Sequence, residues 1–292
     1  MQQLNQVEEF KNLWVLFMAE DNGLDGLQDW LSTQKQHKRS LYGICNRHNL
    51  RTSIQFNKLL LSTLLVEHTH RFIYCSVPKV GCSNWKRTIL QLSMNISGRD
   101  PGEFSQKNIH RSILIKNLTS YSLQKQLFLL QNYTKIMFSR NPLERLVSAY
   151  RDKFLHENDY YSTTVANKIK RKYRHKSNDN STVTFKEFIR YVVEENNNDI
   201  HWMPMFQLCQ PCSIEYDFIG RHESMTEDAD NILKYLGVPK HVHFPDYKKH
   251  SNEGRTTLNI TETFLQHFTK NEIDQIYHKY KTDFLIFNYS YA

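Results

Sequence analysis

Two short segments of this chain carry residues that could bind phosphate. The first combines Lys79, Gly81 and Ser83, and the second places Arg140 directly after an apolar run and Ser148 eight residues later. Each segment is predicted to form a buried strand, a short polar turn and the start of a helix. That geometry presents backbone N–H groups and a helix N-terminus to a phosphate. Two such units predict a ligand with phosphates at two places.

The first turn differs from the loop that nucleoside triphosphatases use. Gly81 allows close backbone approach, Ser83 supplies a hydroxyl and a helix cap, and Lys79 supplies a mobile charge. A triphosphatase loop reads Gly-x-x-x-x-Gly-Lys-Ser/Thr, whereas here the lysine precedes the only glycine. No acidic strand end suited to magnesium is evident, which also disfavours ATP hydrolysis. We therefore predict a phosphate loop of another kind.

The second turn offers a cation and a hydroxyl. Arg140 can reach a phosphate with two parallel hydrogen bonds. Ser148 lies about two helical turns on, so it reaches the same ligand only if that ligand lies along the helix face. The alternative makes Arg140 a surface cation and Ser148 a packing residue. The presence of both phosphate units favours a binding function.

Alternating strands and helices must position these turns. Strands are predicted over 72–77, 135–139 and 216–220, with helices over 84–94, 123–130, 142–155, from 184, over 224–237 and from 269. Capping boxes are predicted at Thr184, Ser224 and Thr269, each with Glu three residues later. This order predicts an α/β fold, a P-loop-like parallel sheet flanked by helices.

The chain divides by composition into two parts. Residues 1–70, including the apolar run up to Leu65, are predicted to form a helical extension that packs on the core, and residues 71–292 the main domain. A basic stretch near 156–183 is predicted to be an insertion or a mobile loop. The longest early apolar run, 13–19, is far short of the roughly 20 residues that span a bilayer, and no secretory signal is visible. We expect a soluble chain, or one that lacks its anchor.

The net charge, the cysteines and the Asn-x-Ser/Thr triplets indicate the class of partner and the cellular compartment. The 292 residues carry a formal charge of +8, which favours anionic partners such as nucleic acid, acidic polysaccharide, phosphorylated cofactors or anionic lipid. Cys209-Gln-Pro-Cys212 could be a disulfide, half a zinc site or a redox pair, but no second such pair exists. We predict a local Cys209–Cys212 disulfide, with free thiols as the alternative. Asn-x-Ser/Thr triplets favour the secretory pathway; they begin at Asn95, Asn117, Asn132, Asn180, Asn259 and Asn288.

Five blocks of the sequence resemble one enzyme family. The run 75–87, Cys-Ser-Val-Pro-Lys-Val-Gly-Cys-Ser-Asn-Trp-Lys-Arg, resembles the 5′-phosphosulfate loop of Golgi carbohydrate sulfotransferases of the chondroitin/dermatan 4-O-sulfotransferase type. The run 138–154 resembles that family's 3′-phosphate motif, and 201–212, 216–223 and 283–289 are similar to further blocks. The similarity covers roughly residues 40–290 in the same order. It departs at the N-terminus, where the family's single membrane anchor is not seen.

The resemblance implies a sulfotransferase fold and 3′-phosphoadenosine-5′-phosphosulfate as the sulfate donor, with no metal. Lys79 would neutralise charge on the bridging oxygen as the sulfuryl group leaves. The 5′-phosphate would be held by Pro78, Lys79, Val80, Gly81, Cys82, Ser83 and Asn84. The 3′-phosphate would be held by Arg140 and Ser148. Asn141, Glu144 and Arg145 complete the predicted set, and Glu144 is expected to form a structural ion pair with a nearby arginine.

Transfer to a hydroxyl also needs a base. We predict His110, in the polar stretch 108–111 where related sulfotransferases carry a histidine base, because an imidazole has a suitable pKa. The chain has 14 histidines, so an ordinary surface role is the alternative. His201 and His250 are the next candidates.

The expected acceptor is an anionic glycan, a chondroitin- or dermatan-like GalNAc 4-hydroxyl or the terminal sugar of an N-glycan. The basic run 168–176 would grip it, unless that run is only solvated. The resemblance implies the lumenal side of the Golgi membrane and no nucleic-acid partner, and it leaves the oligomeric state open. Two alternatives are a P-loop kinase of a small metabolite and a non-catalytic polyanion-binding module.

Overall fold

A five-stranded sheet forms the centre of the molecule. The computed structural model describes residues 24–94, 109–110, 112–156, 159–174, 181–195, 199–247 and 253–290. The strand order is β3-β1-β2-β4-β5, with β1 spanning Leu64–Glu67, β2 Phe72–Cys75, β3 Lys116–Asn117, β4 Thr134–Ser139 and β5 Phe218–Arg221. Strands β2, β4 and β5 run parallel, whereas β1 pairs antiparallel with β2 and β3.

The three parallel strands are apolar because helices cover both of their faces. All four residues of β2 are buried, and Ile136, Met137 and Phe138 of β4 are fully buried. Such continuous apolar runs are typical of parallel strands. The carboxyl ends of β2, β4 and β5 meet at one edge of the sheet, where ligands of open α/β sheets usually bind. The residues that follow them are Ser76, Arg140 and His222.

A helix follows each parallel strand. Helix α4 (Cys82–Ser93) follows β2, α7 (Pro142–Phe154) follows β4, and α11 (Met225–Tyr235) follows β5. Trp85 of α4 packs its ring on Tyr74 at 5.0 Å between centroids, which fixes α4 against the sheet. The other helices are α2 (Leu24–Arg47), α3 (Lys58–Thr63), α6 (Leu123–Asn132), α8 (Ala166–Tyr173), α9 (Phe185–Glu194), α10 (Met205–Cys209), α12 (Leu258–Leu265) and α13 (Lys270–Ile286), with a 3₁₀ turn at Leu118–Ser120 and a π-helix at Asp159–Val165.

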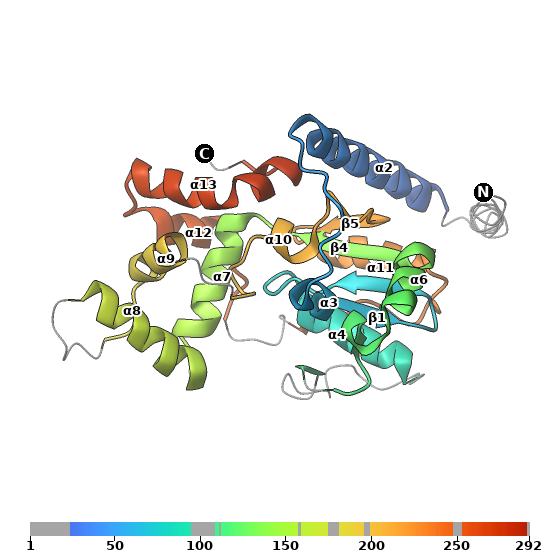
Figure 1. The fold of residues 1–292 in the computed structure, drawn as a ribbon, viewed down its shortest axis with the longest axis horizontal. Helices are drawn as coiled ribbons and strands as arrows, with labels where there is room; N and C mark the ends of the chain where they lie inside the picture. Colours follow the sequence, from blue (N-terminus) through green and yellow to red (C-terminus); the bar gives the residue numbers. More distant parts are fainter. Residues whose placement is uncertain are drawn as a thin grey trace.

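A second apolar cluster lies beside the sheet core. Helices α7, α8, α9, α12 and α13 share it, and α7 runs between the sheet and the other helices (Figure 1). Tyr150 and Phe154 of α7 pack on Phe188 of α9 at 5.8 and 5.3 Å between ring centroids. Since α7 is anchored on this side, its opposite face is free to border the sheet edge.

The structure confirms the predicted fold class and corrects several local predictions. Strands at β2, β4 and β5 are confirmed, but the helix expected up to Leu65 ends at Thr63, and β1 begins at Leu64. The capping boxes at Thr184 and Thr269 are present. Ser224 makes no cap, because its hydroxyl donates to Asp228 Oδ2 at 2.7 Å.

Part of the basic stretch is a helix rather than a loop. Helix α8 buries Ala166 and Ile169 in the second cluster and carries its lysines outside. Lys172 contacts Glu195 at 2.5 Å, and Lys168 contacts the same carboxylate at 3.6 Å. The division at residue 70 remains a prediction, although β1 belongs to the sheet.

The predicted local disulfide is wrong. Cys212 bonds to Cys45 at the end of α2, and Cys209 bonds to Cys75 at the end of β2. Residues 209 and 212 flank the end of α10, so their side chains meet different neighbours. The bridges tie α2 and β2 to the same turn. Within the described residues, no helix is both long and apolar enough to cross a bilayer.

Candidate functional site

A cavity of about 1160 Å³ lies at the carboxyl edge of the parallel strands. Both predicted phosphate segments border it, together with α7, the segment before α10 and the turn after β5. Nine of the predicted site residues line it: Pro78, Lys79, Gly81, Cys82, Ser83, Asn84, His110, Arg140 and Ser148. The structure therefore brings the two sequence segments to one ligand-sized space.

The first phosphate segment is a tight turn with left-handed backbone. Lys79 and Gly81 have φ of 69° and 67°. The left-handed conformation favours glycine at position 81, whereas a Cβ there would meet only the flexible end of the Met225 side chain, at 2.8 Å from Cε. Gly81 is also the residue before α4, and no side chain caps that helix. The first N–H groups of α4 are thus available to an anion. The predicted Ser83 cap is wrong, because the helix already begins at Cys82.

Lys79 forms an ion pair at the wall of the cavity. Its Nζ lies 3.2 Å from Asp152 Oδ2 on α7. Burial lowers the pKa of Lys79, while Asp152 acts in the opposite direction. Lys153 also contacts Asp152, at 3.1 Å, and these two lysines together outweigh the effect of burial and lower the pKa of the Asp152 carboxyl. Asp152 therefore holds the lysine side chain at the cavity wall while both stay charged.

Arg140 joins the second phosphate segment to the first. Its Nη1 donates to the carbonyl oxygen of Lys79 at 3.0 Å, and its Nη2 donates to that of Thr256 at 2.6 Å. Its side chain is only 3% exposed, and its buried Nε has no hydrogen-bond partner among the described residues. An unmatched buried donor is costly. Arg140 also lines the cavity, and a guanidinium suits a phosphate.

Four predicted binding residues do not line the cavity. Val80 is fully buried in the sheet core, and Asn141 caps α7 by accepting from the N–H of Leu143. Glu144 lies 3.4 Å from Arg140 Nη2, as expected for a structural ion pair. Arg145 is 2% exposed and donates to three backbone carbonyls, those of Pro78, Met203 and Ile200. Of these four side chains, only that of Arg145 bonds to the first turn.

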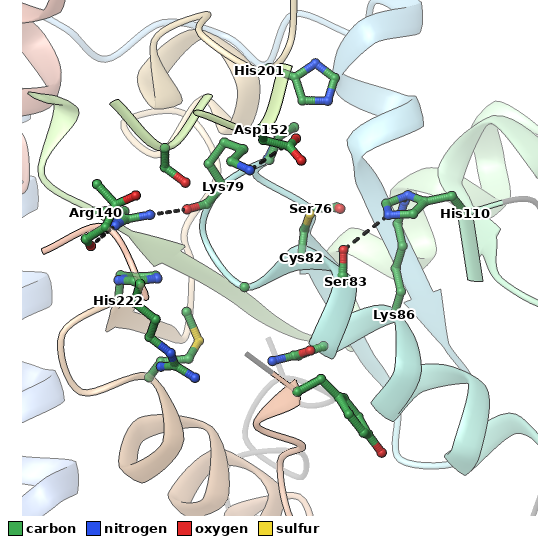
Figure 2. Close-up of a pocket in the computed structure, with 18 of the residues that line it drawn as sticks. Ser76, Lys79, Cys82, Ser83, Lys86, His110, Arg140, Asp152, His201 and His222 are labelled. Carbon is green, nitrogen blue, oxygen red and sulfur yellow. Dashed lines mark hydrogen bonds and ion pairs between the residues drawn. The ribbon is translucent and has the colours of Figure 1, made fainter. Parts of the chain in front are cut away.

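His110 borders the cavity at the start of α4. Its Nε2 lies 3.2 Å from Ser83 Oγ, and its Nδ1 lies 2.9 Å from Lys86 Nζ (Figure 2). Partial burial and the charge of Lys86 lower the pKa of His110 to about 4, so the ring is neutral at pH 7. A charged lysine can only donate a hydrogen bond, so Nδ1 accepts and the ring proton lies on Nε2. In this arrangement Lys86 occupies the basic lone pair of His110.

Several cavity residues were missed by sequence reasoning. His201 was only a secondary candidate, and Lys86, Asp152 and His222 were not singled out, although all four line the cavity. Burial and nearby cations, first Arg140, lower the pKa of His222 to about 3. His222 directly follows β5, as Arg140 follows β4, so its place after a parallel strand was the available signal. His250 lies outside the described residues.

Comparison with known proteins identifies the family. The model of the Sulfotransferase family matches residues 62–290, which include the whole sheet and both phosphate segments. The chain belongs to the Sulfotransferase family. This confirms the resemblance and the fold class predicted from the sequence. No solved structure matches the chain.

Named relatives are carbohydrate sulfotransferases. The chain is 38% identical to carbohydrate sulfotransferase 9 of Homo sapiens over 268 residues, which cover 88% of this chain and 60% of the relative. It is 36% identical to carbohydrate sulfotransferase 8 of Mus musculus, covering 89% of this chain and 65% of that protein. It is 39% identical to carbohydrate sulfotransferase 14 of Danio rerio, covering 88% and 71%. The chain thus spans less than two thirds of the first two relatives.

Proposed function

We propose that this protein moves a sulfuryl group from 3′-phosphoadenosine-5′-phosphosulfate to a hydroxyl of a glycan. One observation carries the proposal. The lysine of the first phosphate segment and the arginine of the second are joined directly, because Arg140 donates to the carbonyl oxygen of Lys79 at 3.0 Å. A single ligand with phosphates at two places would contact both. Membership of the Sulfotransferase family agrees with that ligand.

The described residues fit the two phosphate positions of this nucleotide. The 5′ side would lie on the uncapped start of α4, with Gly81 and Ser83 in reach. The 3′-phosphate would lie against Arg140, just before α7, and Ser148 of α7, both of which line the cavity. Arg145 would support the first turn through the carbonyl oxygen of Pro78, and Glu144 would support Arg140.

Lys79 would stabilise the charge that grows on the bridging oxygen when the sulfuryl group leaves. Positioned cations are most effective where water is excluded, and Lys79 is 17% exposed. Asp152 keeps the ammonium at the cavity wall until that charge appears. Holding sulfate donor and acceptor together supplies much of the remaining rate, as in other group transfers.

We propose an anionic glycan as the acceptor, with the 4-hydroxyl of GalNAc in a chondroitin- or dermatan-type chain as the specific target. An N-glycan terminal sugar is the second candidate. Cations border the cavity beyond the phosphate turns, namely Lys86, Arg87, Arg151 and Lys153. On α8, Lys168 and Lys172 contact acidic side chains, and at the rim Arg151 contacts Glu253 and Lys153 contacts Asp152. Ion pairing does not distinguish the two surfaces, but the rim cations line the cavity whereas no residue of α8 does, so we propose the rim as the glycan surface.

We also propose that the protein works on the lumenal side of the Golgi membrane. Its two disulfides would form and persist in the oxidising secretory pathway. Of the triplets among the described residues, those at Asn132, Asn259 and Asn288 have exposed asparagines that would be available for glycosylation there.

Ligand-dependent thermal unfolding tests the proposed function against its alternatives. We expect adenosine 3′,5′-bisphosphate to raise Tm, and ATP with magnesium to leave it unchanged. A small-metabolite kinase would show the reverse pattern. A polyanion-binding module would respond similarly to heparin and to either nucleotide, and either pattern would contradict the proposal.

A further inference from the structure

A second histidine lies in the cavity beside Lys79 and is held quite differently from His110. His201 is 22% exposed and comes just before α10. Its Nδ1 lies 2.8 Å from Asp199 Oδ1 and 2.9 Å from the hydroxyl of Tyr161. That hydroxyl donates to Asp199 Oδ2 at 2.8 Å. Asp199 also accepts from the backbone N–H of His201 at 2.9 Å, so the ring is held by several bonds.

These contacts decide where the ring proton lies. A carboxylate can only accept, so the Nδ1 of His201 carries the proton and donates it to Asp199. The lone pair is then on Nε2, and no described residue forms a hydrogen bond with Nε2. Because His201 lines the cavity, that lone pair is available to a ligand. His110 has the opposite arrangement, since Lys86 occupies its lone pair.

The position of His201 also suits the reaction. Figure 2 shows the ring next to Asp152 and Lys79, whereas His110 lies on the far side of the turn beside Ser83. Lys79 and Lys153 are close enough to contribute to the lowered pKa of His201. Tyr161, which supports Asp199, belongs to a π-helical turn, a feature frequent at functional sites.

We propose that His201 takes the proton of the acceptor hydroxyl, and that Asp199 and Tyr161 are its positioning residues. The inference rests on the proposed sulfotransferase function. The hydroxyl oxygen forms the new bond to sulfur, and the bond between sulfur and the bridging oxygen breaks. Its electron pair stays on the bridging oxygen of adenosine 3′,5′-bisphosphate, near Lys79. The hydroxyl proton moves to His201 Nε2, and Asp199 stabilises the resulting imidazolium.

The charges around His201 keep it neutral before reaction. Asp199 on its own segment favours the protonated form. Burial, Lys153 on α7 and Lys79 in the phosphate turn oppose it, and the pKa of His201 is lowered on balance. Asp152 on α7 and the hydroxyl of Tyr161 also border the ring. A neutral ring with a free lone pair is the form that a base needs.

The test compares His201→Ala, His201→Gln and His110→Ala with the parent. Sulfate transfer by the parent is measured first, so that failure of the proposed function is seen separately. We expect both His201 variants to bind adenosine 3′,5′-bisphosphate normally and to lose transfer by at least about a hundredfold. Glutamine preserves hydrogen bonding but cannot take a proton. Added imidazole should restore transfer in His201→Ala and not in His201→Gln. His243→Ala, at an exposed histidine on the surface, serves as the control.

The pH profile separates a base from a structural residue. We expect the acidic limb to persist in His110→Ala and to disappear from the imidazole-free residual activity of His201→Ala. Asp199→Asn and Tyr161→Phe should lower turnover with less effect on the affinity for adenosine 3′,5′-bisphosphate. Near-parental transfer in His201→Gln, or loss of the limb only in His110→Ala, would overturn the inference and return the base to His110.

Discussion

At the scale of single residues, the site depends on side chains that hold one another. Arg140 binds the carbonyl oxygen of Lys79, and Arg145 binds that of Pro78 behind the same turn. Arg140 lies between β4 and α7 and Arg145 lies in α7, and each contacts a residue more than sixty positions earlier. The phosphate turn is thus set before any ligand arrives, which reduces the ordering cost of binding.

Arg140→Ala tests the 3′-phosphate position. We expect affinity for adenosine 3′,5′-bisphosphate to fall far more than affinity for adenosine 5′-phosphate, because only the first ligand carries the charge that Arg140 would contact. Isothermal titration of both nucleotides measures the difference. Equal losses for both would mean that Arg140 only supports the turn through Lys79 and Thr256. Lys281→Ala, at an exposed position of α13, is the control.

The pH dependence of kcat/KM should follow the ionisation of His201, the proposed base. A base acts only when unprotonated, so kcat/KM should rise with pH through its pKa and then level off. Burial and Lys153 lower the pKa of His201, so the limb for free enzyme should lie below the ordinary value of about 6.5. The bound anionic nucleotide would raise that pKa, so the limb in kcat should lie higher. A limb in kcat/KM at or above the ordinary value would contradict this assignment.

The sequence predicts the residues proposed to contact a ligand, but not the residues that hold them in place. Lys79, Gly81 and Arg140 could be predicted because each lies in a short motif whose spacing has a local physical meaning. The carbonyl contacts of Arg145 and the pairing of Asp152 with Lys79 could not, because they depend on how α7 lies against the turn. Nor could the sequence show which nitrogen of His110 or His201 is free.

At the scale of elements, covalent links supplement the noncovalent contacts of the short strand β2 and of α2. The link from Cys75 to Cys209 holds the end of β2, directly before the phosphate turn, against α10. The link from Cys45 to Cys212 ties α2 to the following turn. Connectivity of this kind cannot be deduced from cysteine spacing, which is why the local bridge was predicted instead. Strand β1 was missed because a short apolar run fits a helix and a strand equally well.

Replacing Cys45 and Cys212 by serine tests the second link. The bridge closes a long loop of chain, with a sequence separation of 167, so its loss should lower the free energy of unfolding by about 2–4 kcal/mol. Chemical denaturation under non-reducing conditions measures the change. Cys82→Ser, at the free cysteine, is a matched control for stability. Unfolding at the parental denaturant concentration would show that α2 is held by packing alone.

At the scale of the whole molecule, the sheet edge and the helical cluster enclose one basic cavity. The sheet supplies the phosphate turns, and α7 carries both Ser148 and Asp152 along its cavity face. The positive charge of the chain would attract an anionic polymer over distances beyond direct contact.

Salt dependence tests that attraction. The KM for a chondroitin polymer should rise steeply between low and physiological salt, because counterions screen the cations at the rim. A short neutral acceptor should show little change. Lys168→Ala with Lys172→Ala should leave the polymer KM almost unaltered, since no residue of α8 lines the cavity. A large loss in that double variant would place the glycan surface on α8 instead.

Radiolabelled transfer measures the proposed movement of sulfate to a glycan itself. The protein is incubated with ³⁵S-labelled 3′-phosphoadenosine-5′-phosphosulfate and a panel of chondroitin, dermatan and N-glycan acceptors, and the labelled disaccharides are then analysed. We expect label on the 4-hydroxyl of GalNAc. Lys79→Ala should lose transfer by orders of magnitude while its affinity for adenosine 3′,5′-bisphosphate falls less, because charge on the bridging oxygen grows in the transition state. Absence of label from every glycan would rule out the proposed activity, and equal transfer by parent and Lys79→Ala would remove Lys79 from the reaction.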